Sequence, residues 1–245
     1  MIPTDLTIAE AQQQMAAGTL SSEALVQACL ARMHAATDLN IMITVDDEGA
    51  LAAARAVDTA RAAGQPLGPL AGIPLVIKDN IHAKGLPSTA GTPALKDFVP
   101  TEDAPVVQAL RDAGAIVLGK TNMHELAFGA TGYNAAFHVD GVVGVRNPYD
   151  PERIAGGSSS GSAAALGARM SLTALGTDTG VPGLGTLLDS RVAPVQDQNV
   201  HGVSPDIRRC RGRIHRRRRE GGLPVRVWRD ASPHQPDCCP PCLLS

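Results

Sequence analysis

The stretch GIPLVIKDN, residues 72–80, contains a short apolar run that ends on a lysine. A run of this length and composition predicts a buried strand over residues 73–78. Downstream, the pattern predicts a helix over 104–113 closed by Gly114, a second strand over 115–118 and a short helix over 122–128. Strands that alternate with helices favour an α/β architecture with a largely parallel, covered sheet.

Further helices are predicted on both sides of this alternation. Upstream, we expect a helix over 8–17 capped by Thr7, a second that begins at Ser21 or Ser22, and a third over 48–63 that ends before Gly64. Residues 129–160 are rich in Gly, Asn, Pro and Ser, which is typical of loops. They end in the run GGSSSGS, residues 156–162, which leads into a helix pattern over 163–170.

The composition divides the chain near Gly180. The 245 residues are 44% hydrophobic with a net charge of −2, which excludes a disordered chain, a collagen-like chain and a minimal disulfide scaffold. Residues 1–180 carry 11 Lys+Arg and 18 Asp+Glu, whereas residues 181–245 carry 11 Arg, no Lys and 6 acidic residues. We therefore predict a folded part over 1–180 and an Arg-, Pro- and Cys-rich tail over 181–245 that is disordered.

Targeting signals are not evident in the sequence. The N-terminus lacks a basic segment followed by an apolar run, and no uninterrupted apolar stretch approaches about 18 residues. Cys29, the one cysteine in the first 180 residues, lies on the apolar face of a predicted helix, so this part does not require an oxidising compartment. We expect a cytoplasmic protein without membrane association, and the sequence does not indicate its oligomeric state.

The GGSSSGS run admits three interpretations. It could be a flexible linker, a phosphate-binding loop at a helix N-terminus, or a catalytic serine loop at that same helix start. A phosphate loop would need a lysine after its glycines, which is missing, and a catalytic serine needs a base elsewhere. Lys78 is the candidate base, because it ends an apolar strand where burial favours the neutral amine. The alternative for Lys78 is an ordinary strand-end lysine whose ammonium reaches solvent.

Several motifs in the same order resemble those of the amidase signature hydrolases. They are GIPLVIKDN (72–80), STAGT (88–92), GAIVLGKTNMHE (114–125), RNP (146–148), GGSSSGS (156–162) and ALGTDTG (174–180). The resemblance covers roughly residues 5–180. It implies a mixed α/β sheet covered by helices, truncated here because a family domain continues well beyond Gly180.

The resemblance also implies a chemistry and a set of site residues. Lys78 matches the family's neutral base, and Ser158 matches a serine that relays the proton to a nucleophilic serine and follows a cis peptide. Backbone N–H groups of Thr179 and Gly180 match the oxyanion hole, while Thr177 and Asp178 match residues that brace it. The implied substrate is a small carboxylic amide, of the mandelamide or indoleacetamide type, hydrolysed without metal or organic cofactor.

One departure from the family pattern affects the reaction itself. The family motif continues from Gly180 through a small residue to the nucleophilic serine, whereas this chain has Val181 and Pro182. Proline has no hydroxyl and no N–H, so it can neither attack a carbonyl nor donate to an oxyanion. We therefore predict that this chain is inactive or nearly so. A reading-frame shift near codon 180 would explain both the lost motif and the change in composition.

A competing hypothesis treats the protein as noncatalytic. The amidase-like part would then be a scaffold, and the arginine cluster within 208–219 would bind nucleic acid or an acidic partner. We do not favour nucleic acid, because Trp228 is the one tryptophan available for stacking and an out-of-frame origin explains the arginines more simply. A zinc site in the tail is also not favoured, because Cys239 and Cys242 form a single Cys-Pro-Pro-Cys motif without a second ligand pair.

Overall fold

The computed structural model describes residues 2–139 and 141–178 with their side chains, together with the backbone of 200–203, 215–217 and 225–227. The helices are α1 (Ile8–Ala16), α2 (Ser22–Ala35), α3 (Asp47–Ala62), α4 (Pro105–Asp112) and α5 (Ser160–Gly167). Short 3-10 helices are η1 (Pro3–Asp5), η2 (Thr37–Leu39), η3 (Pro93–Leu95) and η4 (Glu125–Ala127). The strands are β1 (Met42–Val45), β2 (Pro74–Lys78), β3 (Ile116–Thr121), β4 (Arg146–Asn147), β5 (Asp150–Ile154), β6 (Thr173–Thr177), β7 (Val200–Val203), β8 (His215–Arg217) and β9 (Val225–Val227).

The central feature is a mixed five-stranded sheet in the order β1-β3-β2-β6-β7. Strand β2 lies between β3 and β6 and runs parallel to both, while β1 and β7 are antiparallel edge partners. Every residue of β2 and β3 is buried, as expected for parallel strands covered on both faces. The predicted α/β class is confirmed, and the two predicted strands are the centre of the sheet.

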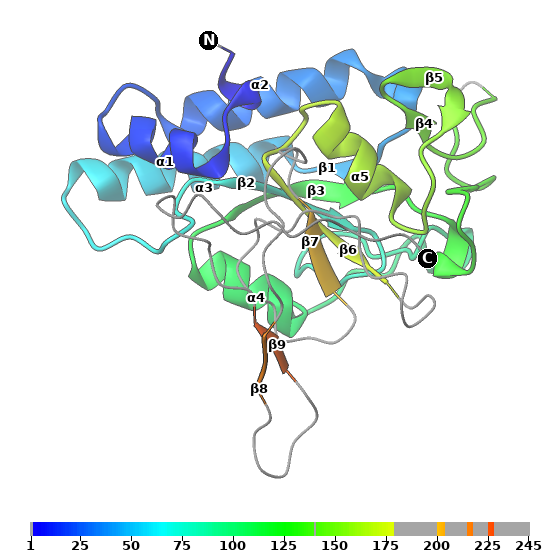
Figure 1. The fold of residues 1–245 in the computed structure, drawn as a ribbon. Coiled ribbons are helices and arrows are strands. Elements are labelled where there is room, and N and C mark those ends of the chain that lie inside the picture. Colours follow the sequence, from blue (N-terminus) through cyan, green and yellow to red (C-terminus); the bar gives the residue numbers. More distant parts are fainter. Residues whose placement is uncertain (1, 140, 179–199, 204–214, 218–224, 228–245) are drawn as a thin grey trace, which may run out of the picture. The chain divides into compact units, whose positions relative to one another are not determined.

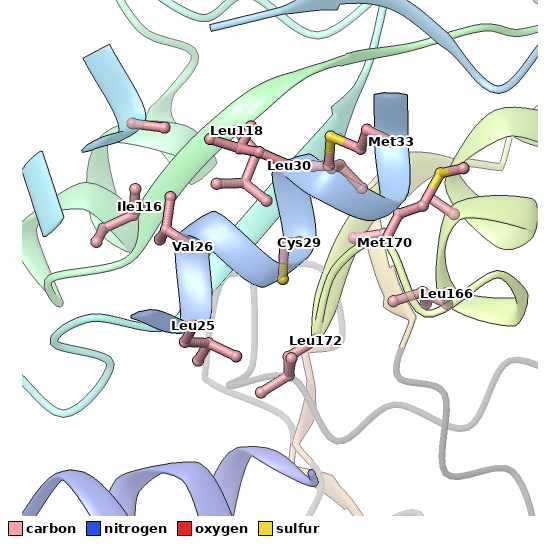
Figure 2. Close-up of a cluster of buried hydrophobic side chains, with 14 of the residues drawn as sticks. Leu25, Val26, Cys29, Leu30, Met33, Ile116, Leu118, Leu166, Met170 and Leu172 are labelled. Atoms are coloured by element: carbon pink, nitrogen blue, oxygen red, sulfur yellow. The ribbon is translucent and has the colours of Figure 1, made fainter. Parts of the chain in front are cut away.

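Two apolar layers cover the sheet (Figure 1). Helices α1, α2, α3 and α5 lie on one face and α4 lies on the other. Figure 2 shows the larger layer, in which α2 places Cys29 between side chains of β3 and of the α5–β6 segment. The smaller layer packs Val107 and Leu110 of α4 against Leu75 of β2 and Val117 of β3. Strand residues therefore alternate between the two layers, which is the period-two pattern of a strand.

The predicted helix starts agree with the cap geometry. Thr7 and Glu10 form a reciprocal capping box at α1, and the Ser21 side chain accepts a hydrogen bond from the Ala24 N–H at α2. Helices α3 and α4 match their predicted spans within one residue at each end. Helix α5 begins at Ser160, three residues earlier than predicted, so the serine run enters the helix.

The short helix predicted over 122–128 is wrong for most of its length. Only η4 forms there, and Leu126 inside it has a φ of 54°. The N–H of Asn122 donates to the Ile41 carbonyl and that of His124 donates to the Ser158 carbonyl, so the first backbone donors are used outside a helix. Strands β1, β4, β5 and β6 were not predicted. The segments of β4 and β5 lack a sustained apolar run, whereas residues 41–45 (IMITV) have one that was missed.

Two short strands, β8 and β9, form an antiparallel pair in a separate unit that spans Arg208–Ser245. With β7, they are the parts of the 181–245 tail that the structure describes. The remaining tail residues, including Pro182 and the tail cysteines, lie outside the described residues. The prediction of disorder for the tail therefore stays a prediction.

Candidate active site

Lys78 ends β2 at the edge of the sheet where β6 also ends. Because β2 and β6 are parallel, their carboxyl ends meet there, and Thr177 is the last residue of β6. The Lys78 side chain is fully buried, and its Nζ lies 2.7 Å from Ser158 Oγ and 2.7 Å from Thr177 Oγ1. Asn80 Nδ2 also donates to Thr177 Oγ1, at 3.3 Å. The amine of Lys78 thus faces two hydroxyl groups.

Two serines of the run hydrogen-bond to the backbone of β6. Ser159 Oγ donates to the Thr177 carbonyl at 3.0 Å and accepts from the Thr177 N–H at 3.2 Å. One turn later, Ser162 Oγ donates to the Leu175 carbonyl at 2.8 Å. These side-chain bonds hold the start of α5 against the strand, and they place the half-buried Ser158 in front of Lys78.

The backbone around Ser158 is held by a second segment. The peptide Gly157–Ser158 is cis, as the family resemblance implies. The Gly157 N–H donates to the Ala130 carbonyl at 2.9 Å, and the Ser158 carbonyl accepts from the His124 N–H at 3.1 Å. Gly161 allows this close approach, since a Cβ there would lie 2.4 Å from the Asn122 carbonyl oxygen. Ser158 is therefore fixed from both sides of its chain.

Burial changes the protonation of Lys78. It lowers the pKa of this amine from 10.5 to about 8, and the carboxylate of Asp178 opposes the shift. Near neutral pH a useful fraction of Lys78 is then the neutral amine, which has two N–H donors and one lone pair. It can donate to Thr177 while its lone pair accepts the Ser158 proton. This arrangement can activate a hydroxyl group.

A second buried lysine lies on the neighbouring strand. Lys120 of β3 is fully buried, with its Nζ 2.7 Å from Ser88 Oγ, 3.2 Å from the Pro87 carbonyl and 3.5 Å from Asp79 Oδ1. The other oxygen of Asp79 accepts from the Thr89 hydroxyl and from the Thr89 and Gly91 N–H groups. We call Lys120, Asp79, Ser88 and Thr89 the clamp, because they tie the loop after β2 to β3.

The sequence-predicted site residues divide into two groups. The structure brings Lys78 and Ser158 together, whereas Thr179 and Gly180, the predicted oxyanion-hole residues, lie outside the described residues. Thr177 was expected only to brace a loop, and its hydrogen bond to Lys78 was missed. Its position at the end of a strand parallel to β2 is the signal that could have indicated this contact.

Neither a metal cluster nor a membrane-crossing helix is found in the described part of the chain. Among residues 2–139 and 141–178, no three His, Cys, Asp or Glu side chains cluster in a way that could hold a metal ion. Over the same residues, no helix combines the length and apolarity that a membrane crossing needs. Cys29 is buried, and burial raises the pKa of its thiol to about 12, which is expected of an unreactive core cysteine.

Comparison with known proteins agrees with this geometry. The model of the Amidase family matches residues 24–181. Mandelamide hydrolase of Pseudomonas putida is 52% identical over 177 residues, which are 72% of this chain and 35% of that protein. A glutamyl-tRNA(Gln) amidotransferase subunit from Acidothermus cellulolyticus is 48% identical over 175 residues, which are 71% of this chain and 34% of that protein.

Solved structures give the same result. The native peptide amidase of Stenotrophomonas maltophilia superposes with a TM-score of 0.65 and 42% identity, over 71% of this chain and 36% of that one. The sequence resemblance and the predicted mixed sheet are thereby confirmed. The chain spans about a third of the length of the curated relatives it matches.

Proposed function

The chain belongs to the amidase family, and on that premise we propose that its site is built for the hydrolysis of a small carboxylic amide to an acid and ammonia. Lys78 is the base and Ser158 the proton relay in this proposal. The single observation that carries it is the 2.7 Å contact between Lys78 Nζ and Ser158 Oγ. A buried amine that faces hydroxyl groups is suited to removing a proton from an attacking alcohol.

The reaction follows from these roles. Neutral Lys78 takes the proton of Ser158, and Ser158 takes the proton of the attacking hydroxyl group, whose oxygen bonds to the amide carbon. The proton held by Lys78 then returns through Ser158 to the amide nitrogen, the carbon–nitrogen bond breaks, and ammonia leaves an acyl-enzyme. Water then releases the acid by the same relay. Backbone N–H groups of Thr179 and Gly180 would stabilise the oxyanion, in keeping with the family motif. Thr177 orients the Lys78 amine by accepting one of its hydrogen bonds.

The attacking hydroxyl group is the missing component. The family motif places a serine where this chain has Pro182, so we propose that the chain hydrolyses amides very slowly or not at all. The 52% identity to a mandelamide hydrolase supports a small amide as the substrate class of the complete site. The alternative of a scaffold with a nucleic-acid-binding tail has no comparable support in the described residues.

The base can be tested without turnover. The chain has four lysines, at 78, 84, 96 and 120, so carbon NMR of labelled lysine can follow each one through a pH titration. We expect Lys78 to titrate near 8, below the ordinary lysine value of 10.5. Lys78→Met assigns the signal. A Lys78 signal that titrates at the ordinary value of 10.5 contradicts its role as base.

The predicted inactivity needs a separate assay. Ammonia release from mandelamide by the purified chain should equal that of Lys78→Ala. Hydrolysis by the unaltered chain that Lys78→Ala abolishes would show that the missing serine is not essential, and would contradict this part of the proposal.

A further inference from the structure

Ser158 has the chemistry of a nucleophile and not only that of a relay. Its hydroxyl is in contact with the Lys78 amine at 2.7 Å, and the residue is only partly buried. We propose that Ser158 and Lys78 form a serine–lysine dyad in which Ser158 accepts an acyl group from activated esters. This activity rests on the proposed function, because it uses the same base, but it does not need a hydroxyl group at position 182.

Competing hydroxyl groups near Lys78 are less suited to attack. Thr177 Oγ1 is equally close to Lys78 Nζ, but it accepts from Asn80 Nδ2 as well, and its carbon is branched. Ser159 Oγ is engaged by both the N–H and the carbonyl of Thr177. Ser160 is fully buried. Ser158 alone among these four combines contact with the amine, partial exposure and a primary hydroxyl group.

The lone pair of Lys78 is directed by its other contacts. When the amine is neutral, an N–H bonded to Thr177 leaves the lone pair available to the Ser158 hydroxyl. Asn80 holds Thr177 as an acceptor through its own N–H donor. Thr177 and Asn80 therefore act as positioning residues for the dyad. The charged group that acts on Lys78 from the end of β6 is Asp178.

The acylation step balances in atoms and charge. Ser158 Oγ attacks the carbonyl carbon of p-nitrophenyl acetate as its proton passes to Lys78 Nζ. The bond between the carbonyl carbon and the phenolic oxygen then breaks, and p-nitrophenolate leaves with that electron pair. The products are acetyl-Ser158, protonated Lys78 and p-nitrophenolate. Activated esters are the suitable class because this leaving group departs without a proton, whereas an amine must first be protonated.

The test uses the full chain and p-nitrophenyl acetate. We expect a burst of p-nitrophenolate that is stoichiometric with protein, and one acetyl group that peptide mass spectrometry places on Ser158. Lys78→Met should slow this acylation by about 100-fold, the usual contribution of a general base. Ser160→Ala is the matched control from the same run and should acylate like the unaltered chain, as should Lys84→Met.

Two further measurements separate reactivity from folding and from the proposed function. Ser158→Cys keeps a nucleophile at the site and should be alkylated by iodoacetamide faster than Cys29, while Ser158→Ala should melt within a few degrees of the unaltered chain yet lose the acetyl adduct. An acetyl group on Lys78 or Thr177, or no adduct on Ser158, overturns the dyad. If Lys78 still titrates near 8 in that case, the base of the proposed function stands and only this inference fails.

Discussion

The two buried lysines of the sheet make an instructive pair. Lys78 ends β2 and Lys120 lies near the end of β3, both side chains are fully buried, and burial lowers the pKa of each to about 8. Their partners differ. Lys120 forms an ion pair with Asp79 and donates to carbonyl and hydroxyl oxygens, whereas the hydrogen bonds of Lys78 go to two hydroxyl groups. A lowered pKa alone therefore does not identify a base.

The difference lies in what each amine can do after it loses its proton. A neutral Lys120 would leave the Asp79 carboxylate buried without its cation, so deprotonation is opposed by the structure around it. A neutral Lys78 keeps hydroxyl groups as its hydrogen-bond partners, and these can reverse their hydrogen bonds without carrying charge. The carboxylate that favours its charged form, Asp178, is exposed and not buried like Asp79. Hydroxyl partners suit a group that must change protonation state, and a carboxylate partner suits one that must hold a loop in place.

Removing the clamp lysine is expected to have the largest effect on stability. Lys120→Met leaves Asp79 as an unpaired buried charge, which typically costs about 3–5 kcal/mol. Lys78→Met is the matched control, because it removes another fully buried lysine whose hydrogen-bond partners are hydroxyl groups. We expect it to change the free energy of unfolding by no more than about 1 kcal/mol. Guanidinium unfolding of both variants measures the two costs. Equal losses would show that the two lysines do not differ in the way described.

Thr89 in the clamp and Thr177 beside Lys78 allow the same comparison with smaller expected effects. Thr89→Val removes a buried hydroxyl that donates to the Asp79 carboxylate, which should cost about 1.5–3 kcal/mol. Thr177→Val removes a half-buried acceptor of Lys78, and water can replace it, so we expect about 1 kcal/mol or less. In turn, Thr177→Val alone should slow the acylation of Ser158. Slower acylation by Thr89→Val at full stability would contradict the division between clamp and site.

Sequence reasoning correctly predicted the two strands at the centre of the sheet and most of the helices, and the two residues it proposed as base and relay, Lys78 and Ser158, are in contact. The apolar run that ends on Lys78 predicted both a strand and a buried amine, because a run of apolar residues indicates a buried strand and the lysine at its end is buried with it. Residues 122–128, which form a loop and η4, were incorrectly predicted to be a helix. Their first backbone N–H groups, those of Asn122 and His124, donate to segments far away in the sequence. Local periodicity carries no information about such contacts.

The role of Thr177 was missed for a similar reason. Its contact with Lys78 depends on β2 and β6 lying side by side and in register, with Leu75 beside Thr173 and Ile77 beside Leu175. The order of strands in a sheet is a property of the whole fold and not of either strand. The clamp was not predicted either, because the pairing of Lys120 with Asp79 also joins two strands.

A pH titration of stability tests both lysines in one experiment. Well below pH 8 each lysine is protonated in the folded and unfolded states, so the full cost of burying the charge is present. Between pH 8 and the ordinary value of 10.5 the folded state has lost protons that the unfolded state keeps, and stability must therefore rise with pH. Burial of Cys29 makes stability fall with pH above pH 9, because the folded thiol, with its raised pKa, keeps a proton that the unfolded thiol loses. The useful window is pH 8–9, in which each lysine should add up to about 1 kcal/mol. As measured by urea unfolding, Lys78→Met should remove about half of the rise. A profile that is flat or falling in the unaltered chain would mean that neither amine is held below its ordinary pKa.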